Sequence, residues 1–308
     1  MKIKNIAIVG GTHGNEYTGV YLIRELNKAQ FQKKWEGLNI ELLIGNPKAY
    51  EKCVRFIDHD LNRSFTKKNL ADFSLSGYEA NRAKAICQKL GGKDDPKMDF
   101  IIDMHTTTSN MGVSIIISDN NDYNFKLAAY IKTKIPECKI PECNIYYMPA
   151  ASYADDNEHS FLISMAAFGF AIEVGPIANG IIRHDINKKT KKVIHATLDF
   201  INQTNAGINP VINDTVEVFK HRKTVAFPKN KDSDISAIIH ENLQDNDYKP
   251  LKKGDSIFST MEGECIAYDE DEELYPVFIN EAAYYYKNIA FSLTEKIMVN
   301  TKNGLTEK

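Results

Sequence analysis

Predicted strands and helices alternate over the first two thirds of this 308-residue chain, and that alternation limits its fold more than any other feature. Short apolar runs predict strands at residues 3–10, 39–44, 99–105, 113–118 and 170–175. Apolar residues at helical spacing predict helices at residues 17–28, 78–90 and 185–203, the last with Asp185 as its N-cap. This pattern is typical of an α/β layered domain built on a mostly parallel sheet.

The pattern changes after the last of these helices. Residues 204–212 are rich in turn formers and read as a linker. Short strand-like pieces follow at residues 216–219, 224–227 and 275–279, separated by polar turns. We therefore expect an α/β domain over residues 1–206 and a smaller β-rich domain over residues 207–308. The acidic run at residues 269–273 reads as a solvated loop, with metal binding as the alternative.

Composition excludes several classes of protein. Lys and Arg number 38 and Asp and Glu 41, so the net charge of −3 argues against a nucleic-acid binder. The longest nearly apolar stretch, residues 165–172, is far shorter than the ~18 residues of a membrane-spanning helix. The five cysteines are scattered and form no C-x-x-C pair, which favours free thiols in a reducing compartment. We expect a cytoplasmic protein with neither nucleic-acid nor membrane partners.

Candidate metal ligands occur where two predicted strands end. His13 and Glu16 lie in the turn after the first strand, spaced so that both can bind one ion. His105 ends the strand at residues 99–105, and the ends of parallel strands meet at one edge of a sheet. Asp103 lies two residues earlier on the same face and is a candidate partner for a ligand. Taken alone, His105 reads as an ordinary strand-end histidine; the other two residues favour a zinc site. The Gly10-Gly11 turn also allows a phosphate site, but no P-loop lysine follows it.

Other charged residues are candidates for the chemistry. Glu173 lies inside an apolar strand, where a carboxylate is either paired in a salt bridge or functional as a general base. Arg55, Asn62 and Arg63 lie in a short loop that can grip a carboxylate or stabilise an oxyanion, although a solvated basic loop is the simpler interpretation.

The ordered motifs resemble a known family. They are G-G-T-H-G-N-E from residue 10, D-x-D-L-N-R from residue 58, D-M-H-T-T-T-S-N-M-G from residue 103, I-E-V-G-P from residue 172 and N-E-A-A-Y-Y from residue 280. In this order they resemble the aspartoacylase and succinylglutamate desuccinylase family of zinc amidohydrolases. The resemblance runs over nearly the whole chain. It implies a zinc-carboxypeptidase-like α/β/α domain and a β-rich C-terminal domain that partly covers the entrance to the active site.

The resemblance also implies roles for individual residues. One Zn²⁺ per chain would be held by His13, Glu16 and His105, and Glu173 would be the general base and then the proton donor. Arg55 would polarise the scissile carbonyl, and Asn62 and Arg63 would hold a substrate carboxylate. Tyr284, from the C-terminal domain, would contact the substrate; its residue type alone indicates only a packed aromatic side chain.

The implied reaction is hydrolysis of N-acetyl-L-aspartate to acetate and L-aspartate, and the implied partner is a small acidic N-acyl amino acid. One position departs from the family pattern: Ile163 stands where an arginine for the second substrate carboxylate is expected, and the segment at residues 153–164 is longer than in the family. His159 and Lys287 are candidates for the missing charge. Acetylglutamate, succinylglutamate and acetylated aromatic amino acids are therefore alternative substrates. A zinc-containing binding protein without catalysis is a further alternative, and the family implies a homo-oligomer, with a dimer expected.

Overall fold

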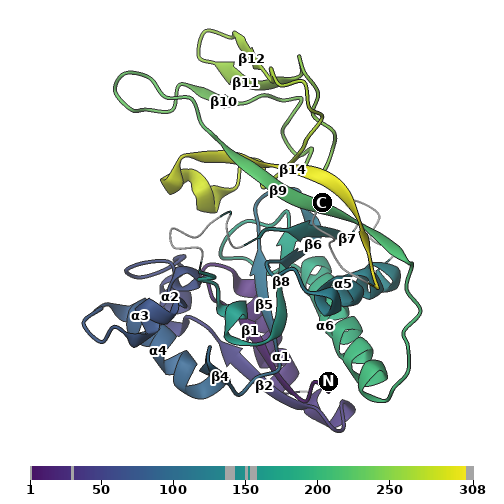
Figure 1. The fold of residues 1–308 in the computed structure, drawn as a ribbon. Helices are drawn as coiled ribbons and strands as arrows, with labels where there is room; N and C mark the ends of the chain where they lie inside the picture. Colours follow the sequence, from purple (N-terminus) through teal and green to yellow (C-terminus); the bar gives the residue numbers. More distant parts are fainter. Residues whose placement is uncertain (1, 29–30, 136–142, 150–151, 153–157, 303–308) are drawn as a thin grey trace.

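The computed structural model describes residues 2–28, 31–135, 143–149, 152 and 158–302 (Figure 1). Within these residues, nine strands form one sheet that runs through both halves of the chain. In spatial order they are β13 (Tyr275–Val277), β14 (Ile289–Asn300), β9 (Thr215–Ala226), β7 (Cys143–Tyr147), β6 (Gly112–Ile117), β8 (Phe168–Gly175), β5 (Phe100–Thr106), β1 (Asn5–Gly10) and β2 (Asn39–Ile44).

Strand direction in this sheet reverses between β8 and β6, and again on both sides of β14. Strands β2, β1, β5 and β8 are parallel, whereas β6 is antiparallel to β8 and parallel to β7, which in turn pairs in parallel with β9. The carboxyl ends of β1, β5 and β8 therefore meet at one edge. The register sets His105 on β5 directly beside Glu173 on β8.

Helices cover both faces of the sheet, and alternate residues of β1 show the two faces. Ile6 and Ile8 pack in a core with α1 (Tyr17–Lys28), α5 (Asp122–Lys134) and α6 (His184–Asn205). Ala7 and Val9 pack in a second core with α4 (Tyr78–Leu90). Figure 1 shows α5 and α6 on one side of the sheet and α3 (Lys67–Ala71) and α4 on the other. The predicted α/β/α layering is confirmed.

Shorter elements join these layers. They are α2 (Pro47–Lys52), the 3₁₀ turns η1 (Phe31–Lys34), η2 (Leu61–Arg63), η4 (Leu162–Met165) and η5 (Ala282–Lys287), and the two-residue strands β3 (Gly91–Gly92) and β4 (Asp95–Pro96).

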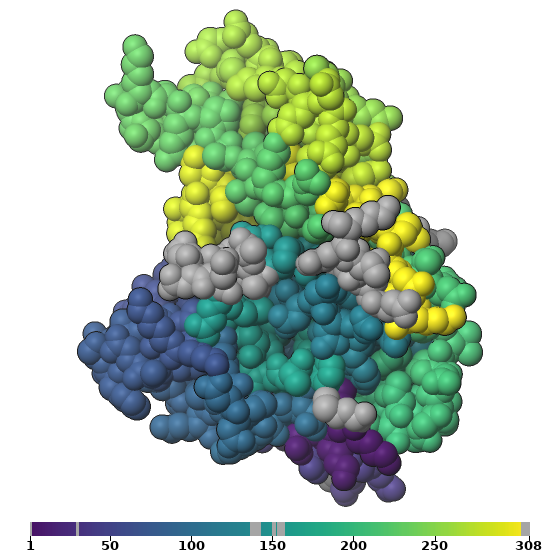
Figure 2. Space-filling view, in the orientation of Figure 1, coloured from purple at the N-terminus to yellow at the C-terminus, as the bar shows by residue number. Residues whose placement is uncertain are grey.

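The C-terminal part has its own small core beyond the end of the large sheet. Strands β10 (Ala237–Ile239), β11 (Ser256–Thr260) and β12 (Cys265–Ala267) form a separate antiparallel sheet. Phe227, Phe258 and Phe291 lie in the core beneath it. Figure 2 shows these green and yellow residues stacked on the α/β part. A β-rich second domain is thus confirmed, while the exact division after residue 206 stays a prediction.

Two local expectations were wrong. Helix α6 begins at His184, so Arg183 is its N-cap residue and Asp185 lies inside the first turn, where its carboxylate accepts hydrogen bonds of 3.1 and 2.7 Å from the Arg183 guanidinium. The pieces predicted at residues 216–219 and 224–227 form one strand, β9, that belongs to the large sheet. The mostly exposed stretch at residues 220–224 interrupts the apolar pattern. The pairing with β14 continues through it, with a register shift that skips Arg222.

Other expectations concern the surface and the thiols. The acidic run forms ion pairs with basic side chains, for example Glu270 with Lys223 and Asp271 with Lys253, as a solvated loop does. Cys53, Cys87, Cys143 and Cys265 are free thiols, and Cys138 lies outside the described residues. Within the described ranges, no helix combines the length and the apolar character needed to span a bilayer.

Candidate active site

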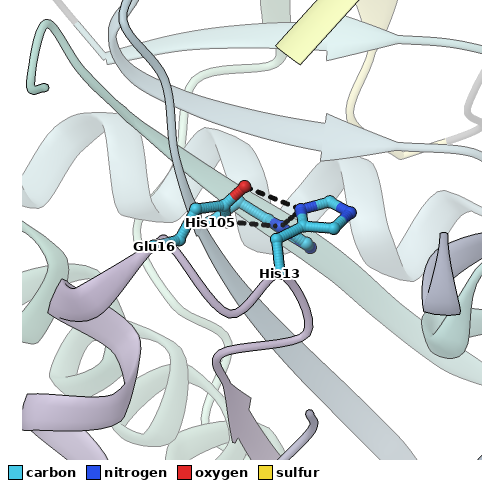
Figure 3. Close-up of side chains that lie close together, drawn as sticks. All are labelled: His13, Glu16 and His105. Carbon is cyan, nitrogen blue, oxygen red and sulfur yellow. Dashed lines mark hydrogen bonds and ion pairs between the residues drawn. The ribbon is translucent and has the colours of Figure 1, made fainter. Parts of the chain in front are cut away.

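His13, Glu16 and His105 form a buried cluster at the sheet edge (Figure 3). His13 and Glu16 come from the turn between β1 and α1, and His105 comes from β5. Nδ1 of His13 lies 2.7 Å from Glu16 Oε1, Nδ1 of His105 lies 2.9 Å from Glu16 Oε2, and the two Nδ1 atoms are 3.1 Å apart. Two imidazoles and a carboxylate are a ligand set that divalent zinc accepts.

A carboxylate holds the outer nitrogen of each histidine. Nε2 of His13 lies 3.0 Å from Asp60 Oδ1, and Nε2 of His105 lies 2.8 Å from Asp103 Oδ2. When both outer nitrogens carry the proton, both Nδ1 lone pairs point at the Glu16 carboxylate. The two Nδ1 atoms and the Glu16 carboxylate are then all acceptors that face one another, and a cation between them would stabilise this arrangement. The residues present therefore fit a metal ion.

The pKa shifts within the cluster also indicate that it is stabilised by positive charge. Burial lowers the pKa of His105, but Asp103 and Glu16 raise it more, so that it lies well above the ordinary value. Burial raises the pKa of Glu16, but His13 and His105 lower it more. Without a cation, the cluster thus keeps a proton on a histidine and the charge on Glu16.

Glu173 stands beside the cluster on β8. The register places it next to His105 on one side and Ser114 of β6 on the other. No described Lys or Arg side chain forms an ion pair with Glu173, so the salt-bridge alternative is not supported within the described residues. Burial raises the pKa of its carboxyl well above the ordinary value; His105 opposes the rise, and Glu16 adds to it. A carboxylate with a raised pKa is suited to accept and return a proton.

The loop before η2 and η2 itself bring Arg55, Asn62 and Arg63 to the same pocket. The Arg55 guanidinium lies 3.4 Å from Glu16 Oε1 and 3.1 Å from Asp60 Oδ2. Burial lowers the pKa of Arg55, but Asp60 and Glu16 raise it more, so the guanidinium stays charged. The amide of Leu162 donates to Asn62 Oδ1 at 2.8 Å, and the Asn62 NH₂ nitrogen lies 3.5 Å from His105 Nε2. The Arg63 guanidinium lies over the Phe161 ring, 4.5 Å from its centre.

A single pocket collects all the predicted site residues. His13, Glu16, Arg55, Asn62, Arg63, His105, Glu173 and Tyr284 line it. Tyr284 comes from η5 of the C-terminal part and packs edge-on against Phe278. The remaining wall is largely apolar, with Thr106 and Glu281 as its polar members. Its apolar members are Ile116, Tyr146, Met148, Phe161, Ala171, Phe278 and Ala283.

Comparison with known proteins assigns this architecture to a family. The model of the succinylglutamate desuccinylase/aspartoacylase catalytic domain matches residues 2–201, and that of the AstE/AspA barrel-sandwich hybrid domain matches residues 214–296. The chain belongs to the succinylglutamate desuccinylase/aspartoacylase family. It is accordingly a hydrolase that acts on amide C–N bonds.

Relatives within this family carry different names. A probable aspartoacylase of Trichodesmium erythraeum is 43% identical over 96% of this chain and 98% of its own length. An N-acyl-aromatic-L-amino acid amidohydrolase of Xenopus tropicalis is 40% identical over 96% of this chain and 93% of its own. The crystal structure of murine aminoacylase 3 superposes with a TM-score of 0.90 at 34% identity and covers 98% of both chains.

The structure also places the residues considered for a second substrate carboxylate in this family member. Ile163 is buried in the core formed by α4, β1 and η4, not in the pocket. Burial, Lys93 and Arg63 lower the pKa of His159 to about 3, so this imidazole is neutral at pH 7. Lys287 is exposed, with its ammonium 5.6 Å from the centre of the Tyr286 ring. None of these residues lines the pocket. Residues 153–157 of the longer segment lie outside the described residues.

Sequence reasoning did not identify two residues that hold the site together. Asp60 is quoted in the D-x-D-L-N-R motif, but its contact with His13 joins residues far apart in the chain. Glu281 lines the pocket and stands three residues before Tyr284. A carboxylate inside N-E-A-A-Y-Y was the available signal for Glu281.

Glu281 joins the C-terminal part to the loop after His105. Its Oε2 accepts hydrogen bonds from the Thr108 amide at 2.8 Å, the Thr108 hydroxyl at 3.0 Å and the Thr107 hydroxyl. Its Oε1 accepts from the Ala283 amide at 2.9 Å and caps η5, which carries Tyr284. One buried carboxylate therefore fixes Tyr284 relative to the cluster of His13, Glu16 and His105.

We expect Glu281→Ala to lower the free energy of unfolding by about 2–4 kcal/mol, because several donors lose a charged acceptor at once. The kcat/KM should fall at least about tenfold as Tyr284 loses its fixed position. Thermal unfolding and steady-state kinetics measure the two effects. The control is Glu262→Gln on the exposed surface of the C-terminal part, which should change neither quantity. A Glu281→Ala protein as stable and active as the wild type would contradict the role of this carboxylate.

Proposed function

We propose that the chain is a zinc-dependent amidohydrolase that cleaves an N-acyl-L-amino acid into a carboxylic acid and a free amino acid. One observation carries the proposal: the His13, Glu16 and His105 cluster, Glu173 and Arg55 all line one pocket. A metal site, a base and a fixed cation are together sufficient machinery for hydrolysis of an unactivated amide.

The residues then have distinct tasks. His13, Glu16 and His105 would hold the zinc, which when bound would act as a Lewis acid and make a water molecule more acidic. Glu173 takes a proton from this water as the water attacks the acyl carbonyl, and returns it to the nitrogen of the leaving amino acid. Arg55, kept charged by Asp60 and Glu16, stabilises the negative charge that develops on the carbonyl oxygen.

Two donors are available for the carboxylate of the amino acid. The Asn62 NH₂ group faces away from the bond that fixes its oxygen, and Arg63 offers a planar guanidinium held against Phe161. Such donors pair well with a carboxylate. We propose that Asn62 and Arg63 hold the α-carboxylate and that Tyr284 contacts the substrate from the C-terminal side.

N-acetyl-L-aspartate is the first candidate substrate. The name of the Trichodesmium erythraeum relative supports it, and so does the positive charge of Arg55 and Arg63 in the pocket.

A specific observation favours a second candidate, an N-acyl amino acid with an apolar side chain. Arg55 and Arg63 are the only Lys or Arg side chains among the described residues that line the pocket, and both already have tasks. A second carboxylate would therefore face Ile116, Met148 and Phe278 without a cation of its own. The name of the Xenopus tropicalis relative agrees with such a substrate.

Hydrolysis of a substrate panel tests the proposal. We expect zinc-dependent release of equal amounts of acetate and amino acid from N-acetyl-L-aspartate or from N-acetyl-L-phenylalanine. The kcat/KM values of these two, with those of acetylglutamate and succinylglutamate, decide between the candidates. A higher value for the phenylalanine derivative would select the second candidate, and no hydrolysis of any compound by the zinc-loaded protein would contradict the function itself.

A further inference from the structure

Glu79 is a buried carboxylate outside the pocket, on the first turn of α4. Its Oε1 accepts hydrogen bonds from the Ile57 amide at 2.7 Å and the Asn46 side-chain amide at 2.9 Å. Its Oε2 accepts from the amides of Asp58 at 2.9 Å and His59 at 3.4 Å. Three successive backbone N–H groups thus converge on one carboxylate, as they do around bound anions.

The segment held in this way belongs to no helix or strand. Residues 53–60 connect α2 to η2 through turns and bends. The amides of Cys53 and Val54 still donate to carbonyls of α2, but those of residues 57–59 have no partner in a helix or strand. Backbone amides in such a position need an acceptor, and Glu79 supplies it from a neighbouring helix. The amide of Tyr78, at the start of α4, adds a hydrogen bond of 2.5 Å to Asp58 Oδ2.

Functional side chains lie on both sides of the anchored amides. Arg55 precedes them, and Asp60, Asn62 and Arg63 follow directly. Asp60 in turn contacts the outer nitrogen of His13 and the Arg55 guanidinium. A shift of residues 57–59 would therefore move both the substrate donors and one partner of the metal cluster.

We propose that Glu79 is a positioning residue that anchors the loop at residues 55–63, and through it sets the substrate donors and the Asp60–His13 contact. For the substrate donors, the inference rests on the proposed function; for the contact with His13, it rests on geometry alone. Glu79 is neither a lining residue of the pocket nor a member of the His13, Glu16 and His105 cluster, so it acts through the loop.

The anchor requires a charged carboxylate of this length. Burial raises the pKa of Glu79, but the hydrogen bonds from the Ile57 amide and Asn46 lower it more, so the group is ionised. A glutamine in the same place has one acceptor oxygen instead of two, and its NH₂ group would face the donating amides of Asp58 and His59. An aspartate keeps the charge but is one methylene shorter.

The experiment compares wild type, Glu79→Gln and Glu79→Asp, with Asn81→Ala on the exposed face of the same helix as the control. Hydrogen exchange of the amides of residues 57–59 should be at least about tenfold faster in Glu79→Gln. Zinc affinity, measured by competition with a chelator, should be up to about tenfold weaker, since an outer partner of a ligand is displaced. The kcat/KM should fall by about 10²-fold, with a clear rise in KM.

Glu79→Asp should be intermediate in each measurement, and Asn81→Ala should match the wild type. Wild-type exchange rates and wild-type zinc affinity in Glu79→Gln would overturn the inference. If Glu79→Gln failed to fold, the same two measurements on Glu79→Asp would decide. Should the wild type hydrolyse no acyl amino acid while exchange and zinc affinity still change, the proposed function would fall and the positioning role would stand.

Discussion

Glu173→Gln should yield a folded protein that binds zinc as the wild type does but turns over about 10²–10⁴ times more slowly. Glutamine matches glutamate in shape but can neither accept the proton of the attacking water nor return it to the leaving nitrogen. Because Glu173 is not among the clustered ligand atoms, its replacement should leave the metal site intact.

The measurement combines kcat on the best substrate of the panel with the zinc content of each protein. KM should change much less than kcat, since Asn62 and Arg63 still offer donors to the substrate carboxylate. Glu36→Gln, on the exposed surface of the α/β part, is the matched control and should behave as wild type. A Glu173→Gln enzyme with wild-type kcat would sink the assignment of Glu173 as the base.

Removal of zinc should abolish activity and also destabilise the fold. The cluster brings hydrogen-bond acceptors from three buried side chains together. After the cation is lost, only a proton shared among these side chains offsets their repulsion. Zinc that binds only the native state raises the free energy of unfolding by RT ln(1 + [L]/Kd). This is about 4 kcal/mol when free zinc is 1,000 times Kd. We therefore expect dialysis against a chelator to lower both kcat and the Tm.

One equivalent of Zn²⁺ per chain should restore both quantities in the wild type. The His105→Ala protein should regain neither, because one ligand and the partner of Asp103 are gone. Full activity of wild-type protein shown by elemental analysis to be free of metal would contradict a metal-dependent mechanism.

Local patterns were sufficient to predict much of the fold. Helices α1 and α4 and strand β2 have the bounds that their apolar spacing indicates, because each buries one stripe or face against a single sheet. The period of two along β5 also put Asp103 and His105 on one face, and the structure joins them by a hydrogen bond of 2.8 Å. The roles of the site residues remain predictions, although the structure brings them into one pocket.

Contacts between distant segments were beyond that reasoning. The interactions of Asp60 with His13, Glu79 with residues 57–59 and Glu281 with Thr107 and Thr108 join parts of the chain that only the packed fold brings together. The apolar pocket wall likewise combines residues of β6, β7 and β8 with Phe278, none of which differs in type from an ordinary core residue. The single strand β9 was missed because polar residues break its pattern while its backbone continues to pair.

The pairing of β9 with β7 has a consequence for engineering the chain. The C-terminal part completes the same sheet that carries Glu173 and His105. A truncation at the predicted domain boundary would therefore leave β7 as an unpaired edge strand. Unpaired edges of this kind recruit strands from other molecules. We therefore expect that the two parts cannot be expressed as separate domains, although their sequences are distinct. A chimaera that exchanges the C-terminal part would have to carry β9, β13 and β14 with it.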